Sequence, residues 1–188
     1  MRRAIPEGDD RQRDVCGACG QVHYDNPRLV AACLAEHQGR LLGCRRAIEP
    51  CHGLWTVPGG FLELGEGTEA GAVREAREEA RATVRPSRPF GWFDLPHIGQ
   101  VHVFFLGELV DGVHAPGHET SETRLVTLAE ARALPLAFPV LAIALELLDG
   151  DRTAGRQQLH LAELHWNGAG DRFDPAQYAL RGHRALEL

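Results

Sequence analysis

The sequence predicts an α/β fold in which a mixed β-sheet is sandwiched between helices (α/β/α). Three observations favour this class. Segments of strand length recur between residues 29 and 127. An amphipathic helix that begins at Thr68 is interposed among them. A second, strongly apolar helix from Pro139 to Leu148 follows the last of these strands, and proline favours the first turn of a helix.

The 188 residues suffice for one domain, or for one domain with a small appendage, and 44% of them are hydrophobic. We expect an N-terminal zinc-ribbon remnant at 1–27, a main domain at 28–149 and a C-terminal extension at 150–188. No apolar run is long enough to cross a membrane and no signal-peptide pattern is present, so a cytoplasmic protein without a membrane partner is expected. The net charge of −6 argues against nucleic acid as a partner, because phosphate binding favours a basic surface.

The N-terminal segment contains Cys16-Gly-Ala-Cys19, which is half of a zinc-ribbon ligand set. Structural zinc needs four ligands, and no second Cys-x2-Cys occurs in the chain. His23 and the pair Cys51-His52 are the candidates to complete a site. The alternative is a knuckle-shaped turn that has lost its metal, so zinc remains an open expectation here.

The main domain carries its strand signals in short apolar or alternating runs. These runs are residues 29–36, 40–46, 55–57, 89–95, 100–109 and 123–127. Residues 111–122 are expected to form a long loop before the last of them. Thr127 is followed three residues later by Glu130, the spacing of a capping box, which predicts a helix start. Residues 158–166 are predicted to be a strand or a docking segment.

The helix that begins at Thr68 follows a loop rich in glycine. Thr68 is a suitable N-cap residue, and Glu69 lies at the positive end of the helix dipole. Small apolar residues form one stripe, which would let the helix lie close to a sheet: Ala72, Val73, Ala76 and Ala80. We expect Glu75, Glu78 and Glu79 on roughly the opposite face.

Three carboxylates on one helical turn repel each other, by roughly 0.2–0.5 kcal/mol for each exposed pair. A hard divalent cation would reverse the sign of that interaction, and oxygen ligands suit Mg²⁺ or Mn²⁺. The alternative interpretation is a solvated Glu/Arg face with pairs such as Arg74 with Glu78. The residues of the helix alone do not decide between the two.

The upstream loop favours the metal. The sequence matches the Nudix box, G-x5-E-x7-R-E-U-x-E-E-x-G-U. Gly60 is followed after five residues by Glu66, and Glu66 is followed after seven residues by Arg74-Glu75-Ala76-Arg77-Glu78-Glu79. Arg81 replaces the last glycine of the box, and Ala82 is a weak apolar residue there. Since that glycine ends the helix in a left-handed turn, Arg81 is expected to affect the helix exit.

Further segments resemble the ADP-ribose/FAD pyrophosphatase-like branch of the Nudix hydrolases that carries an N-terminal zinc ribbon. They lie at 19–27, 44–50, 53–56 and 93–101, and the resemblance covers roughly residues 6–149. Members of the branch carry a second Cys-x2-Cys upstream, where this sequence has Met1. The NADH-pyrophosphatase signature Ser-Gln-Pro-Trp-Pro-Phe-Pro is absent. The resemblance implies a Nudix fold and hydrolysis of a nucleoside diphosphate linked to another moiety, with ADP-ribose or FAD favoured.

The resemblance also assigns metal ligands. Glu78 and Glu79 would bind Mg²⁺ or Mn²⁺ directly, Glu75 would be a ligand or the catalytic carboxylate, and the Gly59 carbonyl would complete the site. Because glycine has no side chain, the backbone at Gly59 can approach a ligand closely.

Positioning and base roles follow in the same way. Arg74 would orient the carboxylates, and Glu66 would pair with Arg74 or hold a metal-bound water. The general base would be a carboxylate of the box, or Glu119 or Glu122 on the expected loop. For Glu119 and Glu122, surface loop charge is an equally good interpretation.

Candidate substrate contacts are less specific. The cations expected to hold two phosphates are Arg45, Arg46, His97 and His102. Trp55 and Phe93 are candidates for stacking on a base, although aromatic residues are more often core. A small nucleotide substrate and a homodimer are expected from the resemblance. The alternatives are a nucleoside triphosphate pyrophosphatase, a nucleotide-sensing Nudix protein without catalysis, and a zinc-ribbon nucleic-acid module.

Overall fold

The computed structural model describes every residue except 169. Among the described residues, nine strands form one mixed sheet, and seven of them follow the order β10-β5-β4-β9-β8-β11-β12. Their bounds are β4 Arg28–His37, β5 Arg40–Arg46, β8 Val84–Leu95, β9 Gln100–Leu109, β10 Thr120–Val126, β11 Gln158–Trp166 and β12 Tyr178–Glu187. Short β6 (Trp55–Thr56) and β7 (Gly59–Phe61) pair with β5 and β4. Parallel pairing of β4 with β9 and of β8 with β11 makes the sheet mixed.

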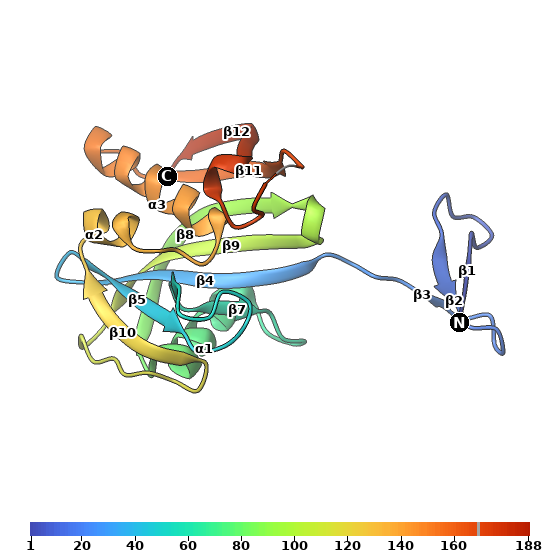
Figure 1. Cartoon of the computed structure of the whole chain (residues 1–188), viewed down its shortest axis with the longest axis horizontal. Coiled ribbons are helices and arrows are strands. Elements are labelled where there is room, and N and C mark those ends of the chain that lie inside the picture. The colour runs from blue at the N-terminus through green and yellow to red at the C-terminus, as the bar shows by residue number, and fades with distance from the viewer. Residues whose placement is uncertain (169) are drawn as a thin grey trace.

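Helices cover both faces of the sheet, which confirms the predicted α/β class (Figure 1). Helix α1 (Thr68–Ala80) lies on one face, and α2 (Leu128–Ala133) and α3 (Pro139–Ala154) lie on the other. Strand β4 shows why: Ala31 and Cys33 pack in the cluster that contains α1, while Ala32 and Leu34 pack in the cluster that contains α3. The two-residue period of a strand divides the core into these two layers.

Helix α1 ends as the glycine-containing box would end, although Arg81 replaces the glycine. Arg81 adopts a left-handed conformation with φ 50°, and its N–H donates to the Arg77 carbonyl. The Ala82 N–H reaches the Ala76 carbonyl at 3.2 Å, so the last turn is closed. The substitution therefore leaves the helix exit intact.

Helix α1 corrects two predictions, one about its N-cap residue and one about the face on which its glutamates lie. Gly67 is the N-cap residue, and no side chain caps the helix, so Thr68 is not the cap. Glu75 and Glu79 are buried on the same side as Ala72 and Ala76, and not opposite to them. At 100° per residue, positions 72, 75, 76 and 79 fall within one half of the helical wheel. Of the three glutamates at 75, 78 and 79, only Glu78 therefore faces solvent.

The C-terminal residues extend the main sheet. Strand β11 pairs in parallel with β8, and β12 adds to β11 in antiparallel orientation. Residues 158–166 are thus a strand, the first of the two predicted alternatives. The expected boundary between residues 149 and 150 falls inside α3, so the structure does not divide the chain there.

The N-terminal residues form a separate small sheet of β1 (Arg2–Ala4), β2 (Arg13–Val15) and β3 (Val22–His23). Figure 1 shows it apart from the main sheet, joined by the segment that leads into β4. In the described part of the chain, no helix is long and apolar enough to cross a membrane.

Candidate active site

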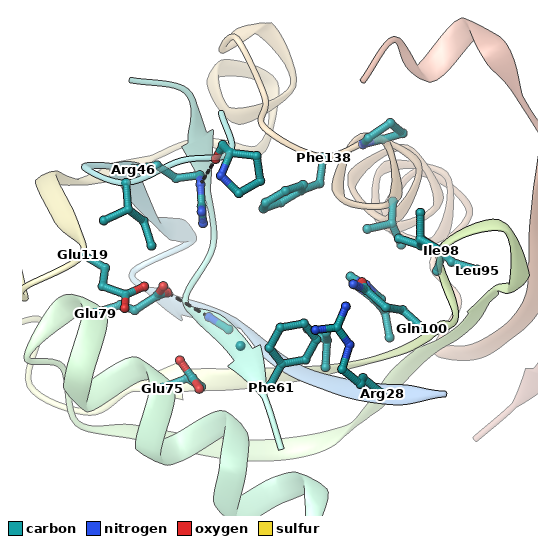
Figure 2. Close-up of a pocket in the computed structure, with 18 of the residues that line it drawn as sticks. Arg28, Arg46, Phe61, Glu75, Glu79, Leu95, Ile98, Gln100, Glu119 and Phe138 are labelled. Atoms are coloured by element: carbon teal, nitrogen blue, oxygen red, sulfur yellow. Dashed lines mark hydrogen bonds between the residues drawn. The ribbon is translucent and has the colours of Figure 1, made fainter. Parts of the chain in front are cut away.

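A cavity of about 1110 Å³ opens beside α1, β7 and the start of β4. Four carboxylates line one wall, from Glu75, Glu78 and Glu79 of α1 and from Glu119 of the loop before β10. Figure 2 shows the Glu79 and Glu119 side chains directed toward one another, with Glu75 beside them. The 3₁₀ turn η1 (Pro96–Ile98) lies across the cavity from these acids.

Two glycines let this wall form. Strand β7 pairs with β4, opposite Ala31 and Ala32. A Cβ on Gly59 would lie 2.5 Å from the Ala32 Cβ, and a Cβ on Gly60 would lie 2.6 Å from the Glu75 carboxylate. The Gly59 N–H donates to Glu79 Oε2 at 3.0 Å, so the loop and the helix are linked at the site.

Burial and mutual repulsion perturb these acids. Burial raises the pKa of Glu79 to about 7, the Gly59 N–H opposes this shift, and the charges of Glu75 and Glu119 add to it. Burial also raises the pKa of Glu75, which Arg74 partly offsets. Crowded carboxylates with raised pKa values are typical of a site that binds a cation or performs acid–base chemistry.

Arg74 bridges two carboxylates of the cavity wall, Glu75 and Glu78, and the neighbouring carboxylate of Glu66. Its guanidinium donates to both oxygens of Glu66 at 2.7 and 3.1 Å, to Glu75 at 2.7 Å and to Glu78 at 3.0 Å. A further bond reaches the Phe61 carbonyl at 3.0 Å. The Arg74 contact lowers the pKa of Glu66. Of the two roles expected for Glu66, the structure shows the pairing with Arg74, and Glu66 does not line the cavity.

Glu119 reaches the cavity because its loop packs on the end of α1. The Ala115 N–H donates to the Ala80 carbonyl and the Gly117 N–H donates to the Glu79 carbonyl, both at 2.8 Å. The Ala47 N–H donates to the Glu119 carbonyl at 2.8 Å. These bonds hold Glu119, which is distant from α1 along the chain, beside the carboxylates of that helix.

Glu122 lies elsewhere, which corrects its assignment to the loop. It belongs to β10, beside a register shift between Thr120 and Glu122, and its carboxylate pairs with Arg124 at 2.5 Å and with Arg45 at 3.7 Å. Arg45 also donates to the Gly53 carbonyl and does not line the cavity. These ion pairs occupy both side chains away from the candidate site.

The predicted stacking residues are core residues. Phe93 is fully buried and packs edge-to-face against Phe104. Trp55 is 5% exposed and lies beneath the Arg124 guanidinium. Neither lines the cavity, so both predicted substrate contacts are wrong. Of the predicted cations, Arg46 does line it, with its Nε anchored on the Pro50 carbonyl at 2.8 Å.

The two predicted histidines line the cavity but do not supply the expected charge. Burial lowers the pKa of His102 to about 4, and its Nε2 lies 2.8 Å from Gln100 Oε1. Burial also lowers the pKa of His97. Burial thus disfavours the charged form of both rings, which favours a role in hydrogen bonding over a role as cations.

Several cavity residues were not predicted from the sequence. They are Arg28, Phe61, Gln100, His118, Phe138, Arg172, Phe173 and Tyr178. Arg28 lies 4.5 Å from the centre of the Phe61 ring, and Arg46 lies 5.1 Å from the Phe138 ring. The position of Phe61 directly after Gly59 and Gly60 was the available sequence signal, and in the structure its ring is 44% exposed beside these glycines.

The donor set fits a hard divalent cation. It offers oxygen atoms only, with an excess of negative charge that burial makes unfavourable. As they stand, no three His, Cys, Asp or Glu side chains of the described residues converge on one metal position, because Arg74 lies between Glu75 and Glu78. The Glu78 side chain is 58% exposed, so only its ion pair with Arg74 has to break for Glu78 to change rotamer.

The fold and this site define the class of the protein. A family model described as the NUDIX domain matches residues 25–147, and the chain belongs to that family of pyrophosphohydrolases. A second model, described as Nudix N-terminal, matches residues 1–25.

Among similar proteins of known structure is a NUDIX hydrolase from Nitrosomonas europaea. It is 37% identical with a TM-score of 0.82, and the match covers 86% of this chain and 92% of that one. The NAD-capped RNA hydrolase NudC of Photobacterium profundum is 31% identical, over 83% of this chain and 58% of its own length. The ADP-ribose pyrophosphatase of Methanocaldococcus jannaschii is 25% identical, over 56% of this chain and 64% of its own. The chain thus spans less than two thirds of these two curated relatives.

Proposed function

We propose that this protein hydrolyses the diphosphate bridge of a nucleoside diphosphate joined to a second moiety, with ADP-ribose or FAD favoured. One observation carries the proposal. The cavity presents carboxylates on one wall and arginine side chains that lie over aromatic rings elsewhere. Arg28 lies over the Phe61 ring, and Arg46 lies over the Phe138 ring. Such a cavity suits a metal-bound diphosphate whose ends carry a flat base.

Glu75, Glu78 and Glu79, with the Gly59 carbonyl, are the groups that would hold Mg²⁺. When bound there, the ion would offset the charge of the bridge and favour attack of water on phosphorus. Arg74 orients Glu75 and Glu78 through the bonds described above. Arg28 and Arg46 would bind phosphate oxygens, and their rings limit the freedom of each guanidinium before a substrate arrives.

Glu119 is the residue that we assign as general base. Glu119 lies beside Glu79 but belongs to a separate loop and is not one of the groups assigned to the metal. It could therefore accept a proton from water while Glu75, Glu78 and Glu79 hold the ion. The charge of Glu119 contributes to the raised pKa of both Glu75 and Glu79, so its carboxylate lies close enough to the proposed metal ligands to act on a water molecule held among them.

The size of the cavity supports a substrate larger than a mononucleotide. Ligand cavities are commonly about 300–1,000 Å³, and this one is about 1110 Å³. Arg172, Phe173 and Tyr178 line its far part, where they offer ring faces to the second moiety of a bridged substrate.

The relatives named NAD-capped RNA hydrolase suggest a second candidate, a nicotinamide dinucleotide or a capped RNA end. The expectation that nucleic acid is not a partner rested on the net charge and on the incomplete zinc-ribbon ligand set, so it stays a prediction. A homodimer also stays a prediction, and light scattering at micromolar concentration decides it, since the mass of a single chain would exclude it.

The test is a substrate panel at saturating Mg²⁺ with ADP-ribose, FAD, NADH, diadenosine polyphosphates, dNTPs and NAD-capped RNA. We expect AMP from ADP-ribose or FAD, and Glu78→Gln should lower kcat by on the order of 10²-fold with the fold preserved. Glu69→Gln is the matched control, because Glu69 lies on the same helix, is exposed and does not line the cavity. Activity that survives excess EDTA, or a dNTP preferred over both ADP-ribose and FAD, would refute the proposal.

A further inference from the structure

The far end of the cavity is built by residues beyond the part of the chain that the NUDIX model matches. Arg172, Phe173 and Tyr178 line it, together with His97 of η1. Figure 2 shows Ile98, which follows His97, across the cavity from Glu79 and Glu119. The C-terminal segment therefore lies at the end opposite the carboxylates.

Aromatic rings gather at this end. The His97 ring lies 5.4 Å from the Tyr178 ring and 6.2 Å from the Trp166 ring, and Trp166 is the register partner of Tyr178 across β11 and β12. Arg172 lies 5.0 Å from the centre of the Phe173 ring. These rings come from three separate elements, so the cluster is a product of the fold and not of one amphipathic stretch.

Hydrogen bonds fix the segment in place. The Phe173 N–H donates to Asp171 Oδ1 and the Ala176 N–H to Asp174 Oδ1, both at 2.9 Å. The Asn167 N–H donates to the Gln177 carbonyl at 3.0 Å. The rings at this end are therefore preorganised, which lowers the entropic cost of binding a ligand.

The Tyr178 hydroxyl and His97 Nε2 already have partners, whereas Trp166 Nε1, which does not line the cavity, is buried without a partner. The Tyr178 hydroxyl donates its one hydrogen to the Arg172 carbonyl at 2.8 Å, so His97 Nε2, 3.2 Å away, is the donor to the Tyr178 oxygen. What remains for a ligand is ring faces and the Arg172 guanidinium. Ring faces suit a flat heterocycle better than a sugar, whose hydroxyls require directional partners.

We propose that residues 171–178 and His97 form a subsite for a second heterocyclic base, so that the enzyme favours a diphosphate bridge flanked by two bases. This inference rests on the proposed function of the cavity and deepens it. Phe61 and Phe138, which lie between the two ends in Figure 2, offer ring faces nearer to the acids. A substrate with one base leaves one of these two sets of rings unused.

The experiment compares kcat/KM for FAD, which has two ring systems, with kcat/KM for ADP-ribose, which has one. Tyr178→Leu should lower the FAD to ADP-ribose ratio about tenfold, the effect of one lost stacking partner. Tyr178→Phe keeps the ring and should hold the ratio within about twofold. Tyr24→Leu is the matched control, since Tyr24 is the other tyrosine of the chain and contacts Arg13 outside the cavity.

Equal losses for both substrates in Tyr178→Leu would show a merely structural role and overturn the inference, as would an unchanged ratio. If the wild-type protein hydrolyses neither substrate in Mg²⁺, the proposed function fails, and the subsite is decided by binding alone. Titration calorimetry in EDTA then compares the Kd values of FAD and ADP-ribose. Tyr178→Leu should weaken FAD about tenfold more than ADP-ribose, and equal weakening would refute the subsite.

Discussion

Gly117 offers the sharpest test of how the loop before β10 serves the site. A Cβ at this position would lie 1.8 Å from the Glu78 carbonyl oxygen, whereas ordinary contact begins at 3.4 Å. The two atoms would have to separate by roughly 1.5 Å. Because that oxygen belongs to the backbone of a packed helix, the loop must move, and Glu119 must move with it.

The magnitude follows from the contacts that the shift breaks. The bonds from Ala115 and Gly117 to α1 are each worth about 1 kcal/mol net, so Gly117→Ala should lower the free energy of unfolding by about 2 kcal/mol. This leaves a folded enzyme if the total stability is typical, about 5–15 kcal/mol. Displacing a reacting carboxylate by about 1 Å should lower kcat on the order of 10²-fold.

Urea denaturation and steady-state kinetics measure the two effects. Glu119→Gln should reproduce the loss of kcat without the loss of stability. Gly150→Ala is the matched control, because a Cβ there meets nothing within 4 Å and the residue lies in α3, where alanine should stabilise by up to about 1 kcal/mol. If Gly117→Ala keeps kcat within about threefold while stability falls as expected, the assignment of Glu119 is wrong.

Three further predictions concern stability and metal content. Arg74→Ala leaves three carboxylates without their shared cation, so the free energy of unfolding in EDTA should fall by about 3 kcal/mol, and by less in Mg²⁺. Equal losses in urea titrations under both conditions would contradict a metal site there. Since burial lowers the pKa of His102 to about 4 in the folded state, against an ordinary value of 6.5 for histidine, the unfolded chain binds the extra proton between these two values. Stability should therefore fall as pH drops from about 6.5 to about 4, by at most about 3 kcal/mol, and His102→Gln should flatten this slope in denaturation curves at pH 7 and 5; an unchanged slope refutes the burial argument. Cys16 and Cys19 supply two of the four ligands that structural zinc needs, so this 188-residue chain should hold well under one zinc, and a stoichiometric, chelator-resistant zinc in elemental analysis would overturn that.

Local patterns predicted the elements whose signals are local. Residues 29–36, 40–46 and 100–109 lie within observed strands, and Thr127 with Glu130 forms the predicted capping box. In each case the hydrophobic period or the cap chemistry lies within a few residues of the element. The box helix is also predicted correctly, but the face predicted for Glu75 and Glu79 is wrong. The i, i+3, i+4 spacing relates these glutamates only to one another, whereas their angle to Ala72 decides which face they occupy.

Other features depend on distant pairing and were beyond reach. Phe93 points into the core because of how β8 pairs with β9 and β11, and Tyr178 reaches the cavity because β12 adds to β11. Glu122 leaves the loop because β10 begins at Thr120 and shifts register there. None of these relations has a local sequence signal, since each pairs segments that lie far apart along the chain.

The net charge of −6 does not argue against a small anionic substrate, because charge acts locally. Arg28 lies over Phe61 and Arg46 over Phe138, and both guanidinium groups line the same cavity as the acids. A ring face attracts a guanidinium and holds it in a partly desolvated position, where its interaction with a phosphate is stronger than at an open surface. Arg172, over Phe173, repeats the arrangement at the far end. The proposed bridged diphosphate would meet separated charges of both signs inside an acidic protein, and its binding should depend less on salt than binding to a broad basic surface would.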